Sequence, residues 1–351
     1  MSEKKFDELF HDTDYVEVNQ KIYRQMNKKI YSKVIKGFVV ICLIVTTIFF
    51  GTSQLLNVVY YNPNHEEKFL KDDNANEFEV LFSTYYQMLH PGIIYVPEMN
   101  RKDTTIKSLG FGRYESRGRI QSIFEPLILG PKVNTSLEIS RSKIEINGPV
   151  ETGCINEFKD PENKGFQAIT ELNEMKKEIE NLPDSAYLDI SLSFENYISL
   201  EDVSEIIRKY PNTVRWIALK NQSFYNVQGI AGGMSTVSHV YWTFTDDAER
   251  EYPMFMLPYD ENITANSLRE HYLSHLKLLL DHPDFINALS NPFGYIITPN
   301  KLKENYEKAQ KELLSYGIRV YIDKKDILKL IEEYDVSYIN INDVKLSRFQ
   351  K

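Results

Sequence analysis

The sequence is poor in cysteine, with two residues among 351, and it lacks an excess of basic charge. Two thiols can close at most one disulfide, so a small secreted scaffold held by several bridges is excluded. Asp and Glu number 50 against 41 Lys and Arg, which gives a net charge of -9. A uniformly basic nucleic-acid-binding protein is therefore excluded, and no direct contact with nucleic acid is expected.

Clear catalytic motifs are also missing, including a G-x-S-x-G nucleophile elbow and a Cys-x-x-Cys pair. His271 and His275 lie four residues apart on a predicted helix, but no Glu lies between them to act as the base of a zinc protease, so a solvated helix face is favoured over a metal site. The glycines at 110 and 112 lack the lysine of a phosphate loop and are interpreted as strand bends. We predict no enzyme, no metal and no cofactor.

Charge is absent from residues 37–65, and residues 38–60 are mainly Val, Ile, Leu and Phe. A helix of this length measures about 35 Å, enough to cross a hydrocarbon core of about 30 Å. A buried core helix is rarely apolar on all sides for so long. A cleaved signal peptide is disfavoured because the basic region and the apolar run are both long and no A-x-A-like site follows. We predict a transmembrane helix at 37–60.

Acidic residues are absent from residues 18–36, which contain six basic ones. Four of these basic residues stand closest to the span and are expected to set its topology: Lys28, Lys29, Lys33 and Lys36. Positive charge stays on the cytoplasmic side, so residues 1–36 are predicted to be a cytoplasmic tail, with the bulk of the chain outside. Tyr60 and Tyr61 are expected in an aromatic belt at the outer interface.

The predicted tail has two parts of opposite charge. Residues 1–17 hold six acids against two lysines, whereas apolar residues recur every fourth position between 18 and 34 of the basic part. Anionic lipids account for the basic part but would repel the acidic, aromatic one. The acidic, aromatic part is better suited to docking on a basic cytoplasmic protein partner. The residues expected to bind it are Phe6, Leu9, Phe10, Asp12, Asp14, Tyr15, Ile22 and Met26.

The rest of the chain is predicted to be α+β. A helix at 76–90 and strands at 93–96, 106–115, 119–128 and 137–146 indicate a β-rich exterior domain at 61–150. A linker rich in Gly, Pro, Asn and Asp follows at 151–165. Residues 166–351 alternate strands at 186–194, 213–219, 295–297, 318–322 and 336–341 with helices at 166–181, 199–210, 265–281, 300–316 and 324–334. This alternation predicts an α/β-sandwich-like C-terminal domain.

Several segments resemble the membrane-anchored anti-sigma factors of low-GC Gram-positive bacteria. FDELFHDTDYVEVNQKIYRQM at 6–26, YYNPN at 60–64, NANEFEVLFSTYYQMLHPG at 74–92 and GFGRYE at 110–115 resemble the sigma factor regulator N-terminal region. AYLDISLSFENYISLEDV at 186–203, NTVRWIALKNQ at 212–222 and FGYIITPNKLKENY at 293–306 resemble the C-terminal domain of the same family.

The resemblance implies that the tail sequesters an extracytoplasmic-function sigma factor and that the exterior part serves envelope stress sensing or assembly of a regulatory complex, for which a second membrane protein is an expected partner. The His-x3-Cys-x2-Cys motif of zinc-containing anti-sigma factors does not precede the span.

An alternative function is an anchored exterior ligand-binding module without a transcriptional role, and a third hypothesis is a membrane-tethered hydrolase. Replacing residues 1–17 by a neutral sequence separates the first two, because the binding module predicts no transcriptional phenotype.

Overall fold

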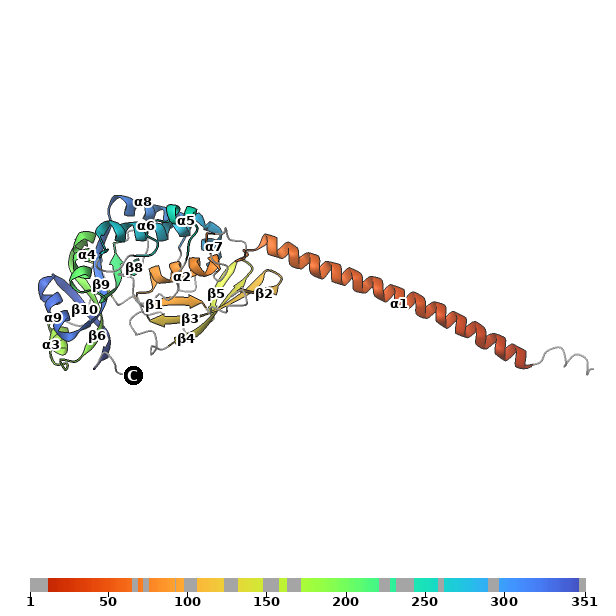
Figure 1. Ribbon diagram of the computed structural model, residues 1–351. Helices are drawn as coiled ribbons and strands as arrows, with labels where there is room; N and C mark the ends of the chain where they lie inside the picture. Colours follow the sequence, from red (N-terminus) through yellow and green to blue (C-terminus); the bar gives the residue numbers. More distant parts are fainter. Residues whose placement is uncertain are drawn as a thin grey trace, which may run out of the picture. The chain divides into compact units, whose positions relative to one another are not determined.

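The computed structural model describes residues 12–64, 69–71, 76–91, 93–97, 106–122, 132–147, 158–162, 172–220, 228–231, 243–257, 262–289 and 297–346. The chain divides into two compact units, Met1–Val59 and Tyr60–Lys351 (Figure 1). The second unit contains two antiparallel sheets with helices. The predicted α+β class with one long N-terminal apolar helix is confirmed.

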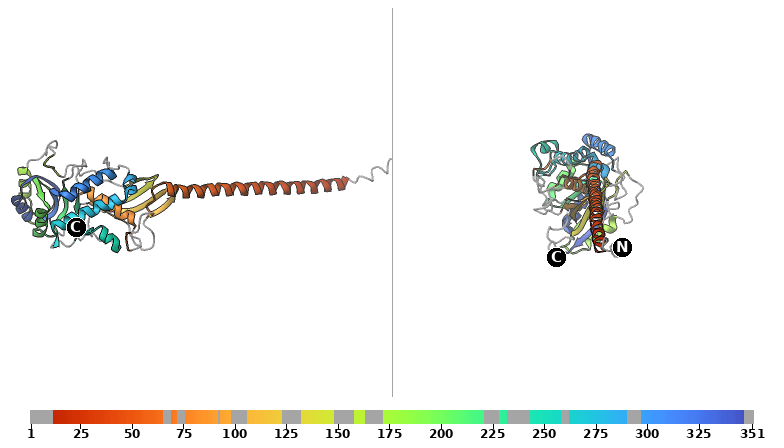
Figure 2. Two further views of the ribbon diagram at one scale, coloured as in Figure 1. Left: turned by 90° about the horizontal axis from the view of Figure 1, so that it is seen from above. Right: turned by 90° about the vertical axis from the view of Figure 1, so that its right-hand side faces the viewer.

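The first unit is dominated by one unbroken helix, α1 (Asp12–Val59), of 48 residues (Figure 2). At 1.5 Å per residue it measures about 72 Å, and it contains no proline that would break it. The part Glu17–Val59 is long and apolar enough to cross a membrane, and its apolar window is not buried against the protein. These properties support a single-pass membrane anchor.

The first sheet of the second unit follows helix α2 (Glu77–Leu89), whose N-cap Asn76 accepts a hydrogen bond from the Phe78 amide at 2.8 Å. Its strands are β1 (Ile93–Pro97), β2 (Ile106–Gly110), β3 (Arg113–Ser122), β4 (Lys132–Ser140) and β5 (Lys143–Asn147). They pair in the order β1-β3-β4-β5, and β2 pairs with the first half of β3.

Two strand predictions in this sheet are wrong. Residues 106–115 and 137–146 each form a hairpin and not one strand, with two-residue turns at 111–112 and 141–142. The glycines at 110 and 112 do mark a turn, but the second turn is Arg-Ser and has no glycine, asparagine or proline that would announce it.

The second sheet has the antiparallel order β10-β6-β9-β7-β8. Its strands are β6 (Tyr187–Ser199), β7 (Val214–Leu219), β8 (Gln228–Ala231), β9 (Leu314–Asp323) and β10 (Val336–Lys345). The helices are α3 (Leu172–Glu180), α4 (Leu200–Lys209), α5 (Asp246–Glu251), α6 (Ala265–Asp281), α7 (Pro283–Ala288), α8 (Pro299–Lys311) and α9 (Lys324–Glu333). The predicted strand at 295–297 lies largely outside the described residues.

Helix α2 links the two sheets through a shared apolar core. Phe82 packs edge-on against Tyr95 of β1, with 5.0 Å between the ring centroids. The indole Nε1 of Trp216 in β7 donates to the Gln87 carbonyl at 3.0 Å. Tyr61 joins the same core beside Phe78 and is 9% exposed, so its predicted place in an aromatic belt is wrong. The predicted domain boundary at 151–165 stays a prediction.

Helix α4 begins with a capping box that the sequence indicates. The Ser199 hydroxyl accepts from the Asp202 amide at 3.2 Å, and the Asp202 carboxylate accepts from the Ser199 amide at 3.1 Å. We expect Ser199→Ala to lower the free energy of unfolding by about 1 kcal/mol, because one helix amide loses its acceptor. Urea unfolding measures the change, with Ser199→Thr as a control that keeps the hydroxyl. Equal stability of the alanine and threonine variants would contradict this role.

Candidate partner-binding helix and the polar network of the second sheet

The tail half of α1 presents two different faces. Five apolar side chains, each about half exposed, recur at intervals of four residues: Val18, Ile22, Met26, Ile30 and Val34. Three exposed basic residues lie roughly on the opposite side between positions 21 and 28, given 3.6 residues per turn: Lys21, Arg24 and Lys28. Between residues 18 and 28 the helix therefore offers an apolar row on one side and positive charge on the other, whereas Lys29 and Lys33 lie on the same side as the row.

The structure places only part of the predicted partner-binding set. Ile22 and Met26 lie in this apolar row and are 49% and 52% exposed. Asp12, Asp14 and Tyr15 belong to the first turns of α1, but their side chains lie outside the described part of the chain. The other three predicted residues precede the described range: Phe6, Leu9 and Phe10. The four predicted topology-setting lysines are all exposed on α1: Lys28, Lys29, Lys33 and Lys36.

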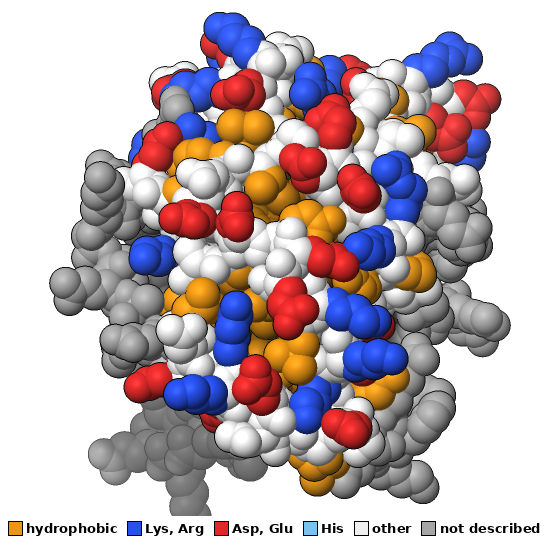
Figure 3. Space-filling model, turned by 90° about the vertical axis from the view of Figure 1, so that its left-hand side faces the viewer, with side chains coloured by type: hydrophobic (Ala, Val, Ile, Leu, Met, Phe, Trp, Pro, Cys, Tyr) orange, Lys and Arg blue, Asp and Glu red, His pale blue; other side chains and the backbone are white. Residues whose placement is uncertain are grey.

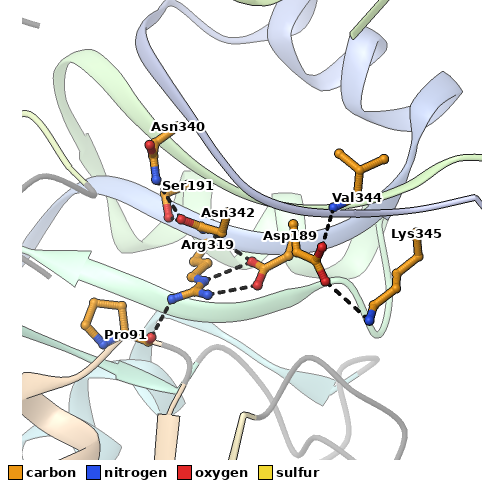
Figure 4. A network of polar contacts seen from close by, with 9 residues as sticks. Pro91, Asp189, Ser191, Arg319, Asn340, Asn342, Val344 and Lys345 are labelled. Atoms are coloured by element: carbon orange, nitrogen blue, oxygen red, sulfur yellow. Dashed lines mark hydrogen bonds and ion pairs between the residues drawn. The ribbon is translucent and has the colours of Figure 1, made fainter. Parts of the chain in front are cut away.

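A buried ion pair that sequence reasoning missed lies in the second sheet. The Arg319 guanidinium on β9 donates to both carboxylate oxygens of Asp189 on β6, at 2.9 and 2.8 Å (Figure 4). Both side chains are nearly buried, and a third guanidinium nitrogen donates to the Pro91 carbonyl at 2.7 Å. Pro91 follows α2, so Arg319 joins the second sheet to the segment leading into the first.

Asparagines extend this network toward the edge of the sheet. The Asn342 amide on β10 donates to the Ser191 hydroxyl at 3.0 Å and to Asp189 at 3.4 Å, and it accepts from Asn340 at 2.6 Å (Figure 4). The sequence carries one signal of this pair: the predicted strand at 186–194 contains a single acidic residue, and the predicted strand at 318–322 contains a single basic residue. Since buried charges need partners, such strands are expected to lie side by side.

His271 and His275 on α6 are buried, so the interpretation as a solvated helix face is wrong. Their rings lie 4.1 Å apart and bond the carbonyls of Met254 and Phe255 at 2.9 and 3.2 Å. Ser274 donates to the preceding carbonyl, that of Pro253. Burial lowers the pKa of His271 to about 4, and burial followed by the charge of His271 lowers the pKa of His275 well below its ordinary value.

The histidine pair has no third metal-binding side chain beside it within the described ranges. Each imidazole uses one nitrogen on a backbone carbonyl, which leaves two nitrogens at most for an ion. The pair acts as a clamp that holds the backbone at 254–255 against α6.

A cavity of about 180 Å³ opens between α8, α6 and the start of β9. Its polar lining comprises a Tyr272–Asn305 hydrogen bond of 3.0 Å, several lysines and a glutamate. Lys220 already pairs with Glu162 at 2.8 Å, and Lys308 pairs with Glu304 at 2.6 Å. Because two of its three lysines are paired with glutamates and Glu312 also lines it, the cavity does not single out an anionic ligand.

The face that carries α3, α4 and α9 mixes acidic and basic side chains (Figure 3). Ion pairs on these helices include Lys209–Glu333 at 2.6 Å and Lys329–Asp326 at 2.9 Å. This face shows no broad area of positive charge of the kind that binds nucleic acid.

The second sheet and its helices correspond to a known family. Residues 179–343, from the end of α3 into β10, match the family described as sigma factor regulator C-terminal. The chain carries a sigma factor regulator C-terminal domain. Comparisons with curated proteins and with solved structures give no match. The family match contains the segments at 186–203, 212–222 and 293–306, so the resemblance drawn from them is confirmed.

The sigma factor regulator domain contains most of the polar network, including Asp189, Arg319 and Asn342, whereas Pro91 lies outside the matched range. The family is one of regulators and supports an anti-sigma regulatory role. It also supports a sigma factor as a binding partner.

Proposed function

We propose that the chain is a single-pass membrane anti-sigma factor whose tail, residues 1–36, sequesters an extracytoplasmic-function sigma factor. The observation that carries this proposal is the exposed apolar row on α1, in a chain that carries a sigma factor regulator domain. The apolar row supplies anchors, and the acids of the tail complement the basic, DNA-reading surface of a sigma factor.

Lipid binding does not account for the whole tail helix. In a helix that continues straight from a span beginning at 38, Ile22 lies about 24 Å and Met26 about 18 Å from the hydrocarbon core, or about 17 Å and 11 Å from the outer edge of a headgroup layer about 7 Å deep. Both distances exceed the Debye length of about 8–10 Å, so attraction to anionic headgroups is screened there. A protein partner in the cytosol accounts for the apolar row.

The proposed orientation follows from the six basic residues before the span, with the N-terminus in the cytoplasm and the second unit outside. In this arrangement the sigma factor regulator domain serves envelope sensing, or assembly with a second membrane protein. The function is regulatory and non-enzymatic.

The apolar row gives a direct test. We expect Ile22→Asp together with Met26→Asp to weaken capture of the sigma factor by the full-length protein about tenfold or more, because two apolar anchors become charged. Co-purification from membranes and transcription from a promoter of that sigma factor measure the effect. Loss of capture should raise transcription.

Gln20→Asp together with Asn27→Asp is the matched control, since it adds the same charge on another face of α1. We expect it to retain capture. If both double variants bind alike, the apolar row is not the docking surface. If neither they nor removal of the tail changes transcription, the alternative of an anchored exterior binding module is favoured.

A further inference from the structure

Two hairpin turns lie together at one end of the first sheet. The first joins β2 to β3 through Phe111 and Gly112, and the second joins β4 to β5 through Arg141 and Ser142. Because Arg113 pairs with Ser140 in the register of β3 and β4, the two turns are neighbours. Figure 1 shows β2 and β5 reaching the same end of the second unit.

Both turns place unusual residues in the left-handed region of the backbone. The φ angles are 55° at Phe111, 50° at Arg141 and 57° at Ser142, and these are three of the five non-glycine residues with positive φ in the described part of the chain. Turns with two positive φ angles favour Gly, Asn or Asp, and a bulky side chain there is strained. Strain of this kind points to a use for the side chains that occupy it.

Apart from glycines and serines, the side chains of the paired turns, residues 107–113 and 140–143, are apolar or basic. Leu109 is 42% exposed, one of few large apolar side chains exposed in the described part of the second unit, and Phe111 beside it is half-buried. The turns hold no acid. Arg113 pairs with Glu138 at 2.9 Å. Three other basic residues are exposed without an ion-pair partner among the described residues: Lys107, Arg141 and Lys143.

The paired turns are tied to the point where the chain leaves α1. The Tyr61 amide donates to the Ser142 hydroxyl at 2.8 Å, and Tyr61 comes two residues after Val59, the last residue of α1. Two residues of extended chain reach about 7 Å. This matches the headgroup layer, which is about 5–8 Å deep on each side of the hydrocarbon core. Chain connectivity therefore keeps the turns beside the membrane that α1 crosses.

We propose that the paired turns form a second contact with the lipid bilayer, in addition to the span. Leu109 and Phe111 enter the interface between headgroups and acyl chains, while Lys107, Arg141 and Lys143 contact anionic headgroups. Apolar insertion combined with basic charge is the chemistry of peripheral membrane binding. This contact rests on membrane anchoring by α1, and it does not depend on the sigma factor.

The test uses the full-length protein in lipid nanodiscs, with Cys42 and Cys154 replaced by alanine. A nitroxide label at Leu109→Cys is compared with one at Met254→Cys, a residue that is 47% exposed elsewhere in the same unit. Collisions with oxygen and with a water-soluble nickel chelate report immersion. In discs containing phosphatidylglycerol, we expect the label at 109 to be shielded from nickel and the label at 254 to be accessible.

The charge dependence is tested with Lys107, Arg141 and Lys143 changed to glutamine in the Leu109→Cys protein. Each lost charge is expected to lower the ratio of docked to undocked turns about fivefold in phosphatidylglycerol discs, with no such effect in phosphatidylcholine discs. Equal nickel access at 109 and 254, or a glutamine variant that stays docked in anionic discs, would overturn the proposal. Capture of a sigma factor by the tail is measured separately, so either proposal can fail alone.

Discussion

Replacing Arg319 with methionine is expected to lower the free energy of unfolding by about 3–5 kcal/mol, because it leaves the Asp189 carboxylate buried without its counter-charge. Asp189 is 6% exposed and Arg319 8%, so water cannot take the place of the guanidinium. The variant also loses the hydrogen bond to the Pro91 carbonyl, and this bond holds the segment after α2 on the second sheet. Urea unfolding of the full chain in detergent, followed by Trp216 fluorescence with Trp242 changed to phenylalanine, measures the loss.

Two further variants separate the ion pair from its surroundings. Lys209→Met breaks an exposed pair with Glu333 and should change the free energy of unfolding much less than Arg319→Met does, because water screens the exposed charges. Arg319→Met combined with Asp189→Val removes both charges and should recover much of the stability, since an apolar pair of similar volume needs no counter-charge. A cost for Arg319→Met no larger than that for Lys209→Met would show that the buried pair is not important for stability.

Local signals in the sequence were sufficient for most helices. Asn76 and Ser199 are side-chain caps, and the helices predicted after them begin within a residue or two of α2 and α4. Strand segments of the second sheet were also found, because apolar runs between turn residues carry the signal. The span followed from a run of uncharged residues that no compact soluble domain requires.

Tertiary contacts decided the features that the sequence did not reveal. Arg141 and Ser142 turn the chain without glycine, asparagine or proline, since pairing of β4 with β5 and the bond from Tyr61 hold them in the left-handed region. Arg319 and Asp189 are 130 residues apart, and only the register of β6 with β9 brings them together. The histidines of α6 were predicted to be exposed because their own helix does not bury them. The segment 253–255, which precedes α6 in the sequence, covers them in the folded chain.

Two buried histidines, His271 on α6 and His90 at the C-cap of α2, predict that the second unit loses stability as the pH falls from about 6.5 to about 4. Burial lowers the pKa of both His271 and His90 to about 4 from an ordinary value of 6.5. In this pH range the two imidazoles are protonated in the unfolded chain but stay neutral in the folded chain, so unfolding is favoured as the pH falls. Each of these imidazoles contributes about 3 kcal/mol above pH 6.5, and this contribution is gone below pH 4.

His271→Asn tests this dependence while keeping a donor near the Met254 carbonyl. Between pH 6 and pH 5, the wild-type protein should lose about 1 kcal/mol more stability than the variant, close to the limit of 1.36 kcal/mol per pH unit for one proton. The carboxylates of Asp246 and Glu333 do not interfere, because their lysine partners lower their pKa values and move their effect below about pH 4.5. Parallel stability curves for the two proteins would mean that His271 is not the group that binds the proton. A flatter curve for the variant would place the acid sensitivity of the sigma factor regulator domain in the clamp that holds residues 254–255 on α6.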